Sequence, residues 1–131
     1  MTLVLDSNVV MLACAAVDGF ARFPAEDLVA PPLMWSEFQS GLHEAQWRGA
    51  VSPALARTTL QRLASAPIHR RPHPRLGQEA WRIADLLGWA KTYDAEYVAL
   101  AQLLSATLVT LDRRLRRGAD RLGFVIGLDE L

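Results

Sequence analysis

The chain has 131 residues, of which 51% are hydrophobic and 21% charged, and this length and balance predict one folded domain over residues 1–131. No apolar run reaches the ~18 residues that cross a bilayer, and the start MTLVLDSN lacks the features of a signal peptide, so we expect a cytoplasmic protein without a membrane partner. The net charge of zero excludes a field over the whole molecule that would attract nucleic acid, and the single cysteine, Cys14, excludes an intramolecular disulfide and a cysteine-based zinc site.

The first half of the chain alternates short apolar runs with helical spacing. Asp6 closes the first run, and the prolines at 32 and 53 stand where helices commonly begin. The pattern predicts, in order, a strand at 2–5, a helix over about 9–17, a strand at 28–30, and helices over about 32–49 and 53–66.

The second half opens with residues 67–74, whose three prolines exclude a helix and indicate a loop or a short extended segment. Gly123 is a candidate helix end, because glycine readily adopts the left-handed conformation found there. The pattern predicts helices over 76–90 and 94–106, a strand at 107–111, an arginine-rich helix to about 121, and a last strand at 124–126.

Continuously apolar strands separated by helices indicate a sheet that is covered on both faces. The predicted fold class is therefore α/β: a three-layer α/β/α sandwich with a short, mostly parallel sheet. In such folds ligands bind outside the carboxyl ends of the strands.

Four acids are predicted to share that edge. Asp6 and Asp112 directly follow predicted strands, and Glu37 and Asp94 lie near the starts of predicted helices, which are at the same edge in a parallel α/β unit. Glu96 is a candidate fifth. Two carboxylates about 5 Å apart repel by roughly 3 kcal/mol at an effective dielectric constant near 20, so the cluster requires a cation or protonation.

Carboxylate oxygens without cysteine or histidine partners favour Mg²⁺ or Mn²⁺. Such an ion lowers the pKa of a bound water and neutralises charge on a phosphate, so the predicted reaction is metal-assisted hydrolysis of a phosphodiester. Taken singly, each acid is better explained as a helix cap, a strand end or a solvated residue, but these explanations do not account for four predicted positions at one edge.

Two other functions are also consistent with these residues. One is a metal-dependent phosphatase or phosphoacceptor domain of related architecture, although Asn8 stands where a D-x-D phosphatase signature has its second aspartate. The other is a non-catalytic module that binds RNA or a protein.

The arginines after Asp112 are a possible nucleic-acid contact. Between residues 113 and 121 the only acid is Asp120, and a solvated helix face and a surface that holds a nucleic-acid backbone are equally consistent with this excess of charge. The candidate RNA-binding residues are Arg113, Arg114, Arg116 and Arg117, with Arg121 at the end of the run.

Four blocks in order, VLDSNVV, PPLMWSEFQSGL, TYDAEYVALA and LVTLDRRL, resemble PIN-domain ribonucleases, specifically the VapC-type toxins of bacterial toxin-antitoxin pairs. The resemblance covers essentially the whole chain. It implies a single PIN-like domain that cleaves RNA with one or two Mg²⁺ or Mn²⁺ ions. The four acids Asp6, Glu37, Asp94 and Asp112 match the family's metal-binding and catalytic positions.

The resemblance also assigns supporting residues and partners. Asn8 and Thr110 match polar positions that support the metal site, and Ser40 stands where many relatives have asparagine. The implied function is an endoribonuclease toxin that forms a homodimer and is neutralised by a cognate antitoxin.

Overall fold

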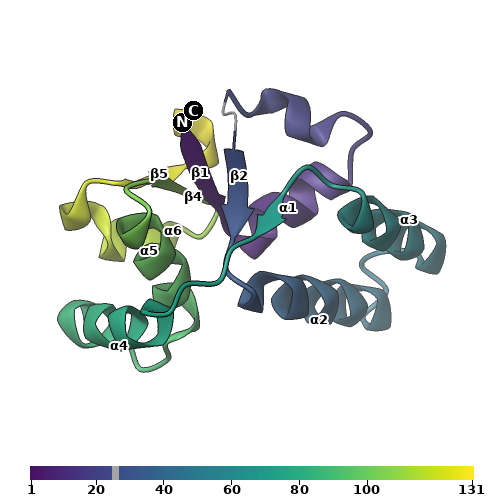
Figure 1. Cartoon of the computed structure of the whole chain (residues 1–131). Helices are drawn as coiled ribbons and strands as arrows, with labels where there is room; N and C mark the ends of the chain where they lie inside the picture. Colours follow the sequence, from purple (N-terminus) through teal and green to yellow (C-terminus); the bar gives the residue numbers. More distant parts are fainter. Residues whose placement is uncertain (25–26) are drawn as a thin grey trace.

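The computed structural model describes residues 1–24 and 27–131, built around a five-stranded sheet (Figure 1). The strand order is β3-β2-β1-β4-β5, and all four pairings are parallel, so the predicted α/β class is confirmed. The strands are β1 (Thr2–Leu5), β2 (Asp27–Ala30), β3 (His69–Arg70), β4 (Thr107–Thr110) and β5 (Val125–Gly127).

Helices cover both faces of the sheet, which makes three layers (Figure 1). The first three helices pack against one another on one side, and the helices that follow β3 and β4 lie on the other. The first group is α1 (Ser7–Cys14), α2 (Leu33–Trp47) and α3 (Pro53–Ala64), and the second is α4 (Leu76–Leu87), α5 (Tyr93–Leu103) and α6 (Arg113–Gly118).

The core lies where β1 and β4 meet α5. Leu3, Val4 and Leu5 are buried, as are Leu108 and Val109 on the neighbouring strand, because helices cover both faces of these strands. On α5 the buried positions are mainly small, and they let the helix approach the sheet closely: Ala95, Tyr97, Val98, Ala99, Leu100 and Ala101.

Helix ends differ from the predictions where turn residues intervene. The helix predicted to reach residue 90 ends at Leu87, because Gly88 adopts a left-handed φ of 72° and its N–H bonds to the carbonyl of Asp85. The first helix ends at Cys14 rather than near residue 17, and a short 3₁₀ turn, Gly19–Arg22, follows it. Gly123 is left-handed at a helical end, as predicted, with a φ of 84°.

None of the helices in residues 1–24 and 27–131 is long and apolar enough to span a membrane.

Candidate active site

The four predicted acids line one open pocket at the carboxyl edge of the sheet. Asp6 follows β1 and Asp112 follows β4, and these two strands are paired neighbours. Glu37 projects from the second turn of α2, and Asp94 from the first turn of α5. Chain segments far apart in sequence thus bring four carboxylates to one place.

Asp6 is the buried member of the group, with only 5% of its surface exposed. Its Oδ1 accepts a 2.7 Å hydrogen bond from the backbone N–H of Ser7 and caps α1, and its Oδ2 accepts a 2.7 Å hydrogen bond from the hydroxyl of Thr110. Burial raises the pKa of Asp6 to about 6 despite these two bonds, and the charges of Asp94 and Glu37 add to the rise.

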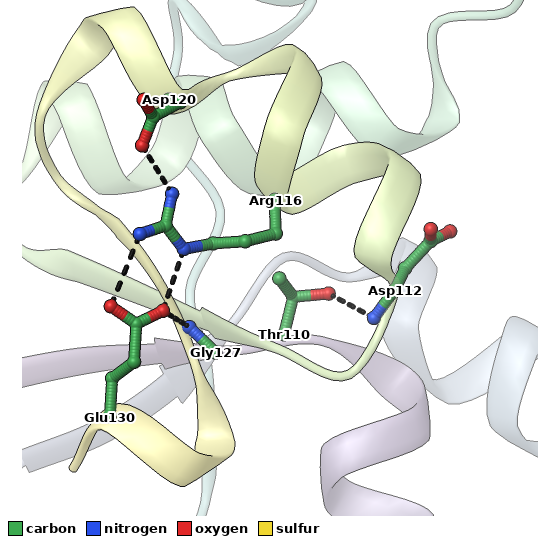
Figure 2. Close-up of polar contacts among 6 residues, drawn as sticks. All are labelled: Thr110, Asp112, Arg116, Asp120, Gly127 and Glu130. Atoms are coloured by element: carbon green, nitrogen blue, oxygen red, sulfur yellow. Dashed lines mark hydrogen bonds and ion pairs between the residues drawn. The ribbon is translucent and has the colours of Figure 1, made fainter.

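Thr110 connects two of the acids. Its buried hydroxyl donates to Asp6 and accepts a 3.0 Å hydrogen bond from the backbone N–H of Asp112 (Figure 2). The Asp112 carboxylate in turn caps α6, because its Oδ1 accepts from the N–H groups of Arg114 and Leu115 at 2.9 and 3.2 Å. The strand end and the helix start are therefore fixed relative to each other.

A buried residue fixes the position of the Glu37 carboxylate. Its Oε1 accepts a 2.5 Å hydrogen bond from the phenol of Tyr97, a fully buried residue of α5. Burial raises the pKa of Glu37, the hydrogen bond from Tyr97 opposes the rise, and the charge of Asp94 adds to it. Tyr97 stands among the apolar residues of its helix in the sequence, so the pattern gives no sign of the role of its hydroxyl.

Asp94 and Glu96 share the first turn of α5. Burial raises the pKa of Asp94, and the negative charge of Asp112 raises it further, whereas the positive charge of Arg114 lowers it. Glu96 is half-buried, and burial and the charge of Glu37 raise its pKa, but it is not among the described residues that line the pocket. The candidate fifth acid thus lies beside the group rather than in it.

Asn8 and Ser40, the other two supporting residues implied by the resemblance, also line the pocket and are exposed. Asn8 lies in the first turn of α1, and Ser40 lies one turn after Glu37 on α2. Both are within the same hollow as the four acids.

The donor set suits a hard divalent cation. Within residues 1–24 and 27–131, no three acidic, histidine or cysteine side chains stand close enough together to form a ready-made metal-binding group. Mg²⁺ does not require one, because it commonly takes one or two protein carboxylates and keeps several waters or substrate oxygens. Burial raises the pKa values of Asp6, Glu37 and Asp94, and neighbouring carboxylates add to each rise, so a bound cation would stabilise the ionised forms.

The candidate RNA-binding arginines separate into different environments. The Arg116 guanidinium is engaged by Glu130, through Nε at 2.7 Å and Nη2 at 3.1 Å, and by Asp120 at 2.6 Å (Figure 2). Arg114 lines a pocket with Asp94, and Arg113 lines another with Asp112. Arg117 is exposed on α6, and Arg121 donates a 2.6 Å hydrogen bond to the carbonyl of Leu86.

Among the lining residues of the carboxylate pocket that the sequence pattern did not indicate are a lysine and a tyrosine near Asp94. Lys91 is the one lysine in the chain, and Tyr93 begins α5 with about half of its surface exposed. Their position in the sequence could have indicated them, because both lie within three residues of Asp94, at the predicted ligand-binding edge.

Comparison with known proteins places this geometry in a family. The family model for the PIN domain matches residues 3–121. VapC ribonuclease Mb0985 of Mycobacterium bovis is 38% identical over 115 residues, which cover 86% of this chain and 87% of that protein. A crystal structure of PAE2754 from Pyrobaculum aerophilum matches 99% of this chain and 91% of its own at a TM-score of 0.74 and 21% identity.

A toxin-antitoxin complex from Klebsiella pneumoniae shares the fold at a TM-score of 0.65 and 15% identity, over 95% of each chain. The matched model covers most of the chain, including all four acids and the strands and helices that carry them. The chain belongs to the PIN-domain family, in its VapC ribonuclease group.

Proposed function

We propose that this protein is a divalent-metal-dependent endoribonuclease and the toxin of a toxin-antitoxin pair. The observation that supports this most directly is the gathering of Asp6, Glu37, Asp94 and Asp112 around one pocket in a chain whose relative is named a VapC ribonuclease. Phosphodiester hydrolysis is the reaction that such a hard-oxygen site suits best.

In this proposal the four carboxylates hold Mg²⁺ or Mn²⁺, which when bound supplies an activated water and neutralises charge on the phosphate. The chain's own residues prepare the site. Thr110 fixes the orientation of Asp6, and the phenol of Tyr97 fixes that of Glu37. Asn8 and Ser40 add polar contacts at the rim.

Arginines of α6 hold the RNA backbone in the same proposal. Arg113 and Arg114 line pockets that adjoin Asp112 and Asp94, and Arg117 is exposed on the same helix. Arg116 is left out of the proposed contacts, although the sequence pattern included it, because its guanidinium already pairs with two carboxylates.

Replacement of single acids tests the reaction. Asp94→Asn and Asp6→Asn should abolish both RNA cleavage in the presence of Mg²⁺ and growth arrest in cells, and EDTA should abolish cleavage by the unaltered protein. Asp85→Asn, at an exposed acid of α4 outside the pocket, is the matched control and should cleave normally. Unchanged toxicity of the Asp94 variant would contradict the proposal.

Calorimetry separates catalysis from mere binding. Titration of the protein with Mn²⁺ should give a saturable signal that Asp94→Asn weakens and Asp85→Asn leaves intact. A non-catalytic RNA- or protein-binding module would show no such Asp94-dependent site. Turnover of a small phosphoester without RNA cleavage would instead favour the phosphatase alternative.

The proposed partners are a cognate antitoxin, as in the Klebsiella complex, and a second copy of the chain, in the cytoplasm. Two tryptophans are largely exposed, Trp47 at 84% and Trp81 at 68%. Large exposed aromatic side chains are typical of protein interfaces, so tryptophan fluorescence should shift on dilution of a dimer or on addition of the antitoxin.

A further inference from the structure

A second pocket adjoins the carboxylates, between the turn that joins α4 to α5 and the start of α6. Its volume is about 480 Å³, and it shares Lys91 and Asp94 with the carboxylate pocket. Its lining includes one aromatic ring, Trp89, and two cationic side chains, Lys91 and Arg114. The part of the pocket next to the carboxylates is therefore lined by positively charged side chains.

The two cations are not committed to partners in the part of the chain that the structure describes. The salt bridges there within 4 Å involve Arg48, Arg75, Arg82 and Arg116, and neither Lys91 nor Arg114 takes part in one. Both side chains belong to exposed residues. The acid that lines this pocket with them is Asp94, on which Arg114 acts electrostatically, and Lys91 also lines the carboxylate pocket.

Contacts with α6 and the turn after it hold the aromatic wall in place. A Cβ added at Gly118 would lie 3.3 Å from the Trp89 ring, so the ring rests against a helix position that has no side chain. The backbone N–H of Trp89 donates to the carbonyl of Ala84 at 2.9 Å, and Arg121 donates to the carbonyl of Leu86 at 2.6 Å. A wall fixed in this way reduces the ordering cost of binding.

We propose that this pocket is an anion subsite that holds a phosphate of the RNA strand next to the phosphate that is cleaved, with Lys91 and Arg114 as its ligands. The inference rests on the proposed ribonuclease activity. Lysine supplies a point charge and arginine a planar fork, both suited to phosphate oxygens. Asp94 repels an anion, so the phosphate lies on the cationic side of the pocket, with its sugar against Trp89.

The salt dependence of RNA binding tests the subsite. The probe is a fluorescein-labelled single-stranded RNA of mixed sequence, and its anisotropy is followed over a series of KCl concentrations in an Asp6→Asn background that does not cleave it. Lys91→Gln and Arg114→Gln should each reduce the slope of log K against log salt by about 0.7. Each should also weaken binding by about tenfold at low salt.

Arg57→Gln is the matched control, because it removes the same charge from an exposed position of α3, which contributes no residue to either pocket. It should leave the slope unchanged. In the protein with all four acids intact, Lys91→Gln should raise KM for RNA with little change in kcat, since a flanking phosphate is bound equally before and during the reaction.

The outcomes distinguish the two proposals. Slopes and KM values like those of the Arg57 control, in a protein that binds and cleaves RNA, would overturn the subsite and leave the ribonuclease intact. Failure of the unaltered protein to bind or cleave any RNA would overturn both.

Discussion

The phenol of Tyr97 donates a 2.5 Å hydrogen bond to Oε1 of Glu37, and this contact joins α5 to α2 at the carboxylate pocket. Tyr97→Phe keeps the buried ring and removes only this bond. We expect RNA cleavage to fall by about tenfold, because a hydrogen bond to a charged group contributes roughly 1.5 kcal/mol and here orients a proposed metal ligand. Steady-state cleavage of RNA with Mg²⁺ measures the effect.

Thermal unfolding serves as the control for Tyr97→Phe. A positioning role predicts that the loss of activity persists at temperatures where both proteins are fully folded. Full activity at such temperatures, together with a lowered Tm, would mean that the hydrogen bond only stabilises the fold.

The hydroxyl of Thr110 lies between Asp6 and the backbone of Asp112, and its removal should be costly. Thr110→Val keeps the shape and leaves the buried Asp6 without its side-chain donor. We expect a loss of about 1–3 kcal/mol in the free energy of unfolding and a large loss of RNA cleavage. Urea denaturation and cleavage assays measure the two effects.

Thr59→Val is the matched control for Thr110→Val. Thr59 is equally buried, and its hydroxyl donates a 2.8 Å hydrogen bond to the carbonyl of Leu55 within α3, away from the pocket. It should lower stability without lowering cleavage by the folded protein. Equal losses of activity in both variants would show that Thr110 has no special connection to the site.

The raised pKa of Asp6 predicts how stability depends on pH when metal is removed. Because the pKa rises from 3.8 to about 6 on folding, the folded state binds the proton more tightly, and this favourable contribution is complete below pH 4 and is lost as pH rises through about 6. The ionised carboxylate then costs about 3 kcal/mol. Urea unfolding in EDTA between these pH values measures the change.

Asp6→Asn should remove this part of the pH dependence, because the amide does not titrate. Mn²⁺ added at neutral pH should restore stability to the unaltered protein more than to the variant. A stability curve that is the same for both proteins across this range would contradict the predicted shift.

The fold and the four acids could be predicted because they depend on simple geometric rules. Continuously apolar strands such as Thr2–Leu5 indicate a covered parallel sheet, and the carboxyl ends of its strands lie at one edge. Asp6 and Asp112 follow β1 and β4 directly, so their meeting depends only on strand order. Glu37 and Asp94 were expected at the same edge because they lie near the starts of predicted helices, and the resemblance to one family assigned the same four acids.

Contacts made by single side chains could not be predicted in the same way. Tyr97 fits an apolar stripe, and only the three-dimensional arrangement of α5 and α2, which cover opposite faces of the sheet, brings its hydroxyl to Glu37. Arg116 belongs to a basic run in the sequence. In the fold its guanidinium bonds to Glu130, fourteen residues further along the chain, and the sequence pattern does not indicate this contact. Trp81 is exposed because it lies beside the face of α4 that carries the buried Ala80 and Ala84.

The pairing of Arg116 with Glu130 should stabilise the end of the chain and not the reaction. Glu130 also accepts a 2.8 Å hydrogen bond from the N–H of Gly127, and its hydrogen bond with Arg116 lowers its pKa to about 2. The ionised Glu130 therefore stabilises the fold above pH 4.5, the ordinary pKa of a glutamate, and this stabilisation is lost as pH falls towards 2. Glu130→Gln should speed hydrogen exchange at the Gly127 amide near neutral pH.

RNA cleavage by Glu130→Gln should stay within about twofold of the unaltered protein, a change of under 0.5 kcal/mol in the activation barrier. The reason is geometric, because the Asp112 carboxylate points away from the Arg116 guanidinium (Figure 2). Asp129→Asn changes the charge of the neighbouring exposed acid and should leave exchange at Gly127 unaltered. A large gain in RNA affinity in the Glu130 variant alone would show that the freed Arg116 reaches RNA and that Glu130 normally withholds it.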